Sequence, residues 1–283
     1  MTIETTIKHR YEIASAVEET NASKTFKAQD LTYQRDVFLK AISIPSDAVL
    51  AKQVLNAAEA EAKAMIAVGS RSAHVPALYE HFYDEASRTF YIVMQLIQGD
   101  TLAERTATKR IAETEFLSAL ITVCDVLALM KKNNYVHKDL KPANIMISKD
   151  EITYLIDFGS SVRGITRAGD GTIGYRAPEM VGRSSIITDR SRADIFSIGV
   201  MLYEFFTGKR PKEDTDYKPA SGGKNWRTFV VPREAAPQIL ADLDALIVKC
   251  MACHPHDRCD VYELKNGLNK VRHTLLKNRR RRG

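Results

Sequence analysis

The sequence lacks a hydrophobic run long enough to cross a membrane. Its longest apolar stretch, residues 195–206, contains Glu204 and is far shorter than the roughly 20 residues that a spanning helix needs. We expect no signal peptide either, because residues 1–10 are polar and charged. We therefore expect a soluble cytoplasmic protein, and a membrane-tethered one only if the chain is a fragment of a longer protein.

Cysteine is scarce, and three of the four residues lie between positions 250 and 259. Cys250, Cys253 and His254 form the C-x-x-C-H pattern of haem attachment, and with His256 and Cys259 the segment also fits a zinc cluster. Haem attachment of this kind requires export, which the N-terminus does not support, and Cys250 lies on the apolar stripe of a predicted helix. We therefore expect ordinary core and loop cysteines.

Acidic residues are fewer than basic ones, which gives a net charge of +6. Much of the excess lies at residues 277–282, where five of six residues are lysine or arginine. Such a run is usually a solvated tail, so no nucleic-acid partner is expected. The alternative is a segment close to the anionic leaflet of a membrane.

Hydrophobic residues make up 45% of the 283 residues, which excludes a mainly disordered chain and suggests two packed lobes or one large domain. Periodicity and turn signals predict strands early in the chain and helices later. The expected strands begin at residue 11 and lie at 25–28, 36–42, 78–83, 89–97, 145–148 and 153–156. The expected helices cover 47–68, 113–134, 191–208, 237–252 and 260–276, and 212–224 is expected to be a surface loop.

The most informative stretch reads H-K-D-L-K-P-A-N over residues 137–144, and D-F-G follows at residues 157–159. It resembles the catalytic and metal-binding loops of eukaryotic-like protein kinases, whose patterns are H-R-D-L-x-x-x-N and D-F-G. Phosphoryl transfer needs little covalent participation from the protein, so a carboxylate that aims the attacking hydroxyl and two oxygen ligands for magnesium do most of the work. The resemblance assigns the carboxylate to Asp139 and the metal ligands to Asn144 and Asp157.

The resemblance extends over nearly the whole chain, from about residue 11 to residue 273. It implies an α+β, bilobal protein-kinase-like fold. A β-rich lobe with one main helix would cover residues 1–97, and a helical lobe would cover residues 98–273. Residues 274–283 would form a basic tail.

Two further residues indicate which hydroxyl accepts the phosphate. Lys141 matches the lysine that steadies the transferred phosphate in serine/threonine-type kinases. Thr172 matches the threonine that contacts the catalytic aspartate in the same group. The resemblance therefore implies a serine or threonine acceptor in a protein substrate.

Lys40 matches the strand lysine that binds the phosphates of ATP in the family. Helical spacing places Glu61 on the apolar stripe of the predicted helix, which comprises Leu50, Val54, Ala58, Met65 and Val68. A carboxylate on such a stripe must be paired, and the family pairs the equivalent glutamate with the strand lysine. We predict a Lys40–Glu61 ion pair, with Glu59 at the edge of the stripe as the alternative.

Glycine is absent from residues 11–28, where the family carries G-x-G-x-x-G so that backbone N–H groups can approach phosphate closely. Glu18 and Glu19 place negative charge there instead. Phe38 faces the same side of its strand as Lys40, where the family usually has alanine above the adenine.

The resemblance also assigns residues around the adenine. Met94 would be the gatekeeper and Met146 the floor, while backbone groups of Gln95 and Ile97 would face the base. Outside the nucleotide site, Asp194 resembles the buried aspartate that accepts hydrogen bonds from the catalytic-loop backbone.

Two positions concern the segment after the D-F-G motif. Arg258 matches the family's structural arginine that pairs with Glu179. Lys138 replaces the arginine of H-R-D, which grips an activation-loop phosphate in a bidentate fork that lysine cannot reproduce. Switching by phosphorylation is therefore expected to work less well than usual at the candidate positions Ser160, Ser161 and Thr166.

These residues favour a serine/threonine protein kinase that uses ATP and Mg²⁺. The absent glycines and Phe38 keep a second hypothesis open, a pseudokinase or nucleotide-binding regulatory module with little or no phosphotransfer. A phosphotransferase that acts on something other than protein is a third hypothesis.

Overall fold

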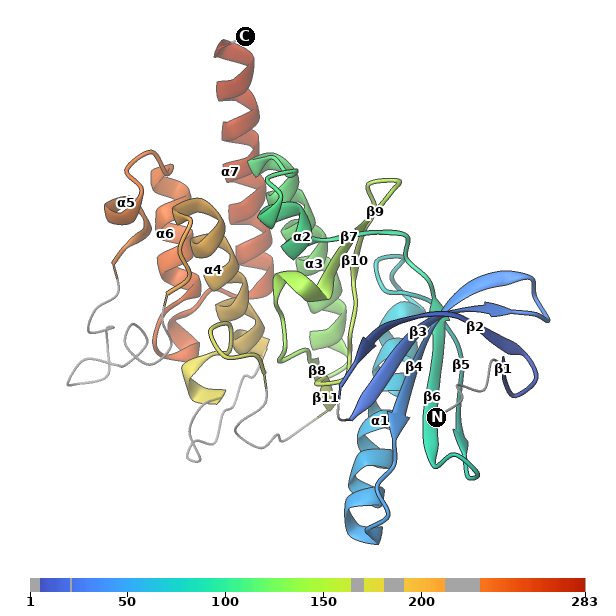
Figure 1. Ribbon diagram of the computed structural model, residues 1–283. Coiled ribbons are helices and arrows are strands. Elements are labelled where there is room, and N and C mark those ends of the chain that lie inside the picture. Colours follow the sequence, from blue (N-terminus) through green and yellow to red (C-terminus); the bar gives the residue numbers. More distant parts are fainter. Residues whose placement is uncertain (1–5, 21, 164–170, 181–190, 212–229, 283) are drawn as a thin grey trace. The chain divides into compact units, whose positions relative to one another are not determined.

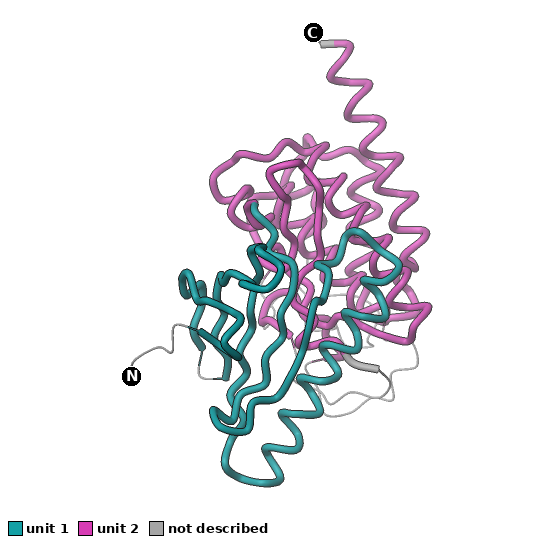
Figure 2. Tube along the Cα trace, turned by 90° about the vertical axis from the view of Figure 1, so that its right-hand side faces the viewer, with its two compact units in different colours: residues 1–98 teal, residues 99–283 magenta. Residues whose placement is uncertain are grey.

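The computed structural model describes residues 6–20, 22–163, 171–180, 191–211 and 230–282, and it has the predicted α+β architecture. The chain divides into two compact units, residues 1–98 and residues 99–283 (Figure 2). The expected surface loop at 212–224 and Thr166 lie outside the described residues.

Unit 1 is built on a six-stranded antiparallel sheet with the strand order β1-β2-β3-β4-β6-β5. Neighbouring strands in this order are mostly consecutive in the sequence, as in a meander of hairpins (Figure 1). The strands are β1 (Thr6–Ile7), β2 (Tyr11–Glu19), β3 (Ser23–Asp30), β4 (Arg35–Ser43), β5 (Leu78–Asp84) and β6 (Thr89–Gln95).

The two faces of strand β4 carry different kinds of residue. Val37, Leu39 and Ala41 are buried in the hydrophobic core, whereas Phe38 and Lys40 are only partly buried. Successive side chains of a strand point to opposite faces, so the alternation places Phe38 and Lys40 together on the other face, as predicted.

Helix α1 (Ala48–Gly69) begins where predicted, because the side chain of Asp47 accepts a hydrogen bond from the backbone N–H of Leu50 at 2.8 Å. Most of the predicted apolar stripe is at least partly buried, but the first buried residue is Ala58. Leu50 remains 47% exposed, so the stripe was predicted to start too early.

The hairpin of β2 and β3 closes without glycine. Its register runs from Tyr11 opposite Asp30 to Glu19 opposite Lys24, with irregularities on the β2 side. At the tip, the side-chain oxygen of Thr20 accepts hydrogen bonds from the N–H groups of Ala22 at 3.3 Å and Ser23 at 3.0 Å. Two amides that could otherwise face an anion are therefore satisfied inside the hairpin.

Unit 2 is mainly helical and carries two small sheets, β10-β9-β7 and β11-β8. Its strands are β7 (Gly99–Thr101), β8 (Tyr135–Val136), β9 (Ile145–Ser148), β10 (Thr153–Leu155) and β11 (Val162–Arg163). Its helices are α2 (Leu102–Ala107), α3 (Glu113–Lys132), α4 (Ser191–Thr207), α5 (Pro232–Ala235), α6 (Ala241–Cys250) and α7 (Val261–Arg282), with short 3₁₀ turns η1 (Pro142–Asn144), η2 (Pro178–Met180) and η3 (Pro255–Asp257).

The core of unit 2 forms where α3 packs against α7 and α4 packs against α6. Helix α4 is buried continuously from Ala193 to Tyr203 and ends before Gly208, whose positive φ of 73° is typical of a helix C-cap. Helix α6 starts later than predicted, at Ala241, and a turn at residues 237–239 separates it from α5.

Helix α7 continues to Arg282, past the predicted end at residue 276. Its last turns extend beyond the other helices of unit 2 in both views (Figures 1 and 2). The basic run is therefore helical, since lysine and arginine are good helix formers. No described helix is long and apolar enough to span a membrane.

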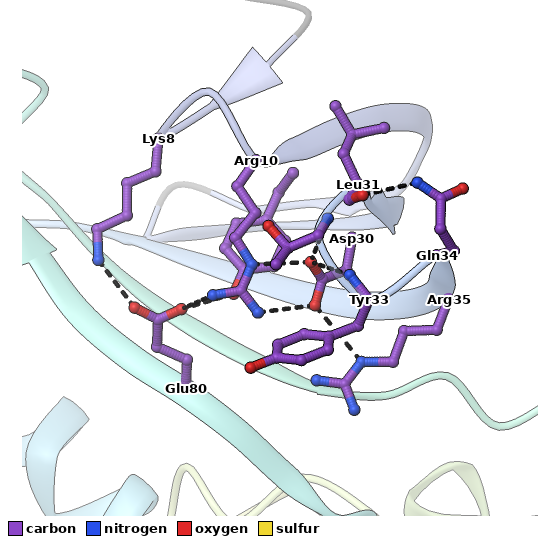
Figure 3. Close-up of polar contacts among 10 residues, drawn as sticks. Lys8, Arg10, Asp30, Leu31, Tyr33, Gln34, Arg35 and Glu80 are labelled. Carbon is purple, nitrogen blue, oxygen red and sulfur yellow. Dashed lines mark hydrogen bonds and ion pairs between the residues drawn. The ribbon is translucent and has the colours of Figure 1, made fainter.

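A charged network ties the turns of unit 1 together (Figure 3). Asp30 is fully buried and accepts two hydrogen bonds from the Arg10 guanidinium, at 2.7 and 2.8 Å. Arg10 also donates to Glu80 at 3.1 Å, and Lys8 donates to the same carboxylate at 2.9 Å. Arg35 lies 3.4 Å from Asp30. The bidentate bond from Arg10 lowers the pKa of Asp30 to about 2.

We predict that Asp30→Asn destabilises the protein by about 2 kcal/mol at neutral pH, because a lowering of about two pKa units corresponds to roughly that energy. A depressed pKa in the folded state adds stability above the unfolded pKa of 3.8 and loses it as the pH falls towards 2. Urea unfolding across this pH range should show that the difference in unfolding free energy between the variant and wild type becomes smaller as the pH falls. Asp36→Asn, at an exposed position of β4, is the control, and a pH-independent difference would contradict the prediction.

Candidate active site

In unit 1, the predicted ion pair between Lys40 of β4 and Glu61 of α1 is confirmed. The Lys40 ammonium lies 2.8 and 3.0 Å from the two carboxylate oxygens. Glu61 is only 3% exposed, so its charge requires this partner. The alternative is wrong, because Glu59 is exposed and pairs with Lys63 at 2.9 Å.

Each unit, taken by itself, carries some of the residues that the resemblance assigns to the adenine. In unit 1, Phe38 lies opposite Met94 in the β4–β6 register, and Met94 and Ile97 are each 8% exposed. The backbone N–H of Gln95 donates to the carbonyl of Ala77 at 2.9 Å, so a base contact by Gln95 depends on its carbonyl.

In unit 2, Met146 lies on β9 between two buried isoleucines and is itself partly exposed. Strand alternation therefore turns Met146 away from the side on which Ile145 and Ile147 are buried. Its partners in the register are Thr101 of β7 and Tyr154 of β10.

The catalytic loop of unit 2 is held by the buried carboxylate of Asp194 on α4. Its two oxygens accept hydrogen bonds from the backbone N–H groups of His137 and Lys138, each at 2.9 Å, which confirms the prediction. Lys138 has a positive φ of 68°, a conformation that costs energy for a residue with a Cβ. Burial raises the pKa of Asp194, against the opposing effect of these donors.

The carboxylate of Asp139, the residue after Lys138, is in contact with two polar side chains, those of Thr172 and Lys141. Its Oδ1 accepts hydrogen bonds from the backbone N–H and the hydroxyl of Thr172, at 2.7 and 2.6 Å. Its Oδ2 lies 2.8 Å from the Lys141 ammonium, which also donates to the Thr172 hydroxyl at 2.9 Å. The predicted contact between Thr172 and Asp139 is therefore confirmed.

The protonation state of Asp139 follows from these contacts. Burial alone would raise the pKa of its carboxyl, but the hydrogen bonds from Lys141 and Thr172 outweigh that effect, and the pKa lies below its usual value. Asp139 is consequently ionised at neutral pH and has a fixed orientation. An ionised, oriented carboxylate can aim a hydroxyl and accept its proton.

Asn144 and Asp157 supply the oxygen atoms expected for Mg²⁺. The side-chain N–H of Asn144 donates to the backbone carbonyl of Asp139 at 2.8 Å, which leaves the amide oxygen as its ligand atom. Asp157 is exposed, with a positive φ of 61°, while the adjacent Phe158 is fully buried against His137, with ring centroids 5.6 Å apart.

This donor set fits magnesium. Mg²⁺ is usually held by one or two protein oxygen ligands together with water and substrate phosphates. Among the described residues there is no cluster of three or more His, Cys, Asp or Glu side chains that could hold a metal ion. Cys250 is fully buried, as its place on an apolar stripe predicted.

Sequence reasoning missed the role of Gly171. Its φ is 98°, and a Cβ there would lie 2.8 Å from the carbonyl oxygen of Lys138. The segment that carries Thr172 can therefore approach the catalytic loop only if residue 171 is glycine. The sequence contains no signal for this approach, since it depends on two segments that are more than thirty residues apart.

The predicted structural pair of Arg258 and Glu179 is also confirmed. The fully buried guanidinium donates two hydrogen bonds to Glu179, at 2.6 and 2.7 Å. Of the candidate phosphorylation positions, Ser161 is buried at 2% exposure, whereas Ser160 is partly exposed. Ser161 is therefore inaccessible to a second kinase in this structure.

Comparison with known families matches residues 11–267 to the family described as the protein kinase domain. The chain therefore belongs to the protein kinase family. The serine/threonine-protein kinase PknB of Mycobacterium tuberculosis is 30% identical over 277 residues, which cover 91% of this chain and 42% of PknB.

Two cyanobacterial relatives give the same result. The serine/threonine-protein kinase A of Synechocystis sp. is 26% identical over 275 residues, which cover 89% of this chain and 51% of the relative. PknA of Nostoc sp. is 26% identical over 272 residues, which cover 90% and 46%. The chain spans about half the length, or less, of these relatives.

We predict that Thr172→Val lowers kcat for phosphotransfer by about a hundredfold, the lower end of the range seen when a site loses one oriented donor. Thr172→Ser keeps the hydroxyl and should stay within a few fold of wild type. Because the lost hydrogen bond lowers the pKa of Asp139, the acid limb of the pH–rate profile should move to higher pH in the valine variant. Equal rates and profiles for valine and serine would contradict the prediction.

Proposed function

We propose that the chain is a serine/threonine protein kinase that transfers the γ-phosphate of ATP to serine or threonine hydroxyls of protein substrates. The observation that carries the proposal is the carboxylate of Asp139, which hydrogen bonds from Thr172 and an ion pair with Lys141 hold in one orientation. Few structural roles would require an ionised carboxylate that is both half-buried and directed by three donors.

Four residues of unit 2 have separate roles in the proposed phosphoryl transfer. Asp139 aims the acceptor hydroxyl and takes its proton as the bond to phosphorus forms. Lys141 lies beside this carboxylate and places a positive charge next to the phosphate that moves. Asn144 and Asp157 would hold Mg²⁺, which would neutralise charge on the phosphates of ATP.

The residues of unit 1 bind the nucleotide. Lys40, whose ammonium Glu61 holds in place, attracts the phosphates as a point charge. In unit 1 the base is proposed to contact Phe38, Met94, Ile97 and the backbone of Gln95. Met146 of unit 2 is a separate candidate for contact with the base. The ring of Phe38 stands where a smaller side chain would leave more room, which favours a closely packed or stacked base.

The hairpin of β2 and β3 supports the rival proposal of a nucleotide-binding regulatory module. Thr20 satisfies two tip amides that a glycine-rich loop would offer to phosphate, and Glu19 is exposed beside Lys24, with which it pairs at 2.6 Å. Weaker phosphate binding by this hairpin lowers affinity for ATP but leaves the set around Asp139 complete. The kinase is therefore the better-supported proposal.

Incubation with ATP, Mg²⁺ and a generic basic protein substrate tests the proposal. We expect label transfer that Asp139→Asn and Asp157→Ala each reduce by about a hundredfold or more, because one removes the carboxylate and the other a metal ligand. Asp150→Asn, in the exposed turn between β9 and β10, is the matched control and should retain activity. Chromatography of the hydrolysed product should place the label on serine or threonine.

The rival proposal, a nucleotide-binding regulatory module, predicts a different outcome of the same experiment. If wild type transfers no label while ATP and Mg²⁺ raise its thermal midpoint, the chain is a nucleotide-binding module. Transfer that survives both aspartate substitutions would show a contaminating kinase and overturn the assignment of Asp139 and Asp157.

We further propose that the basic end of α7 is a solvated helical surface of a cytoplasmic protein. Its residues from 277 to 281 are exposed, and all four cysteines are free thiols, as a reducing compartment favours. Co-sedimentation with anionic vesicles should therefore be absent or unchanged on deletion of residues 277–283. Binding that this deletion abolishes would show membrane contact instead.

A further inference from the structure

Two buried cysteines of unit 2 lie side by side although nothing in the proposed kinase chemistry uses them. Cys250 ends α6 and Cys259 precedes the first turn of α7. Their sulfur atoms are 3.5 Å apart, and the side chains are 0% and 1% exposed. Of the other two cysteines, Cys124 of α3 is also buried and interacts electrostatically with both members of the pair, whereas Cys253 is partly exposed. Only Cys250 and Cys259 are in sulfur–sulfur contact among the described residues.

The chain between these two thiols is the loop that holds Arg258. Besides its bonds to Glu179, the Arg258 guanidinium donates to the carbonyls of Ala252 at 2.8 Å, Cys253 at 3.1 Å and Arg192 at 3.0 Å. The loop from residue 251 to residue 258 is therefore folded around one buried guanidinium. A covalent link between its ends would close this loop.

Packing determines which of the two cysteines can move. A Cβ placed on Gly199 of α4 would lie 2.7 Å from the Cβ of Cys250, so Cys250 is packed tightly against the backbone of α4. Cys259 lies in the short connection between η3 and α7. A disulfide needs a sulfur–sulfur distance of about 2.05 Å, which a displacement of Cys259 by about 1.5 Å would reach.

The two thiols also differ in acidity. The hydrogen bond between the two sulfur atoms lowers the pKa of Cys259 against the effect of burial. Packing assigns the roles, because Cys250 is held against the backbone of α4 whereas Cys259 lies in the connection between η3 and α7. Cys259 is therefore taken as the thiol that meets the oxidant as its thiolate, and Cys250 as the thiol that resolves it.

We propose that Cys250 and Cys259 are a redox-active thiol pair that a hydroperoxide converts into a reversible disulfide, closing the loop that carries Arg258. The inference goes beyond the proposed kinase activity and does not depend on it. It assigns a modification site to two residues that would otherwise be ordinary core cysteines.

The chemistry balances in two steps. The Cys259 thiolate attacks one peroxide oxygen, the O–O bond breaks, and protonation of the leaving oxygen gives water or an alcohol and a sulfenic acid on Cys259. The sulfur of Cys250 then attacks the Cys259 sulfur, the S–O bond breaks, and a second water leaves as the S–S bond forms. The two thiols lose two electrons and two protons, and the hydroperoxide accepts both.

Burial sets the rate of the first step. Hydroperoxide reaches Cys259 only when the loop opens locally, so the pair should react more slowly than the partly exposed Cys253. Once the sulfenic acid has formed, its partner is already adjacent, and the second step should be fast.

Treatment of the folded protein with hydrogen peroxide, followed by alkylation of free thiols and trypsin digestion, tests the proposal. Trypsin cleaves after Lys249, Arg258 and Lys265, so Cys250 and Cys253 fall in peptide 250–258 and Cys259 falls in peptide 259–265. We expect mass spectrometry to find these two peptides joined, and separated again by dithiothreitol. Fragmentation of the joined species should place the bridge on Cys250.

Two variants separate this bridge from its competitor. Cys253→Ser should keep the joined peptides, and Cys259→Ser should lose them. The fragmentation result on wild type stands even if Cys259→Ser folds poorly. A bridge that disappears in Cys253→Ser, oxidation confined to Cys253, or a bridge that forms only after unfolding in urea would each overturn the proposal.

Thermal unfolding provides a second readout that does not depend on activity. A bridge across this short loop restricts the unfolded chain, and the expected rise in the thermal midpoint of the oxidised Cys253→Ser protein over the reduced form is about 5 °C. An unchanged or lowered midpoint in a protein with the mapped bridge would show that the bond strains the native loop, and would overturn the claim that it closes that loop in place.

Discussion

The buried carboxylate of Asp194 fixes the geometry on which the catalytic residues depend. It binds two successive backbone N–H groups, of His137 and Lys138, and so holds Lys138 in a left-handed conformation that its side chain disfavours. That conformation sets the direction of the following residue, Asp139. The carboxylate of Asp194 on α4 thus influences the direction of the Asp139 side chain. Burial and hydrogen bonding in the rest of unit 2 offset the energy of the strained turn at Lys138.

Unit 2 carries the residues proposed for phosphoryl transfer, and unit 1 carries the proposed phosphate-binding pair of Lys40 and Glu61 together with a hairpin that lacks glycine. Within each unit, the pairings of these residues agree with their proposed roles. The tip of the hairpin, by contrast, is organised by Thr20 rather than by glycine. Since phosphate binding by backbone amides requires donors that are not already satisfied, affinity for ATP should depend more on Lys40 and the metal ligands than it does in members with the glycine-rich loop.

Arg258 links this chemistry to the rest of unit 2. It holds Glu179 at the end of the segment that carries Thr172, and it draws the loop between α6 and α7 around itself. The cysteines at the two ends of that loop are therefore placed where a covalent change would act on a structural element shared with the site. Because a fully buried guanidinium must keep its partners, the loop has little freedom to rearrange in other ways.

The sequence by itself indicated the family, the longer strands and helices in their order, and the identity of the polar residues, because each of these follows from local periodicity or from motifs with fixed spacing. It also predicted the pairing of Lys40 with Glu61, since an acid on an apolar stripe needs a base. Only the tertiary structure excluded Glu59, left Leu50 exposed, required glycine at position 171 and brought Cys250 beside Cys259. These outcomes depend on which surfaces meet after folding, and distances between segments far apart in the chain are not encoded in any local pattern.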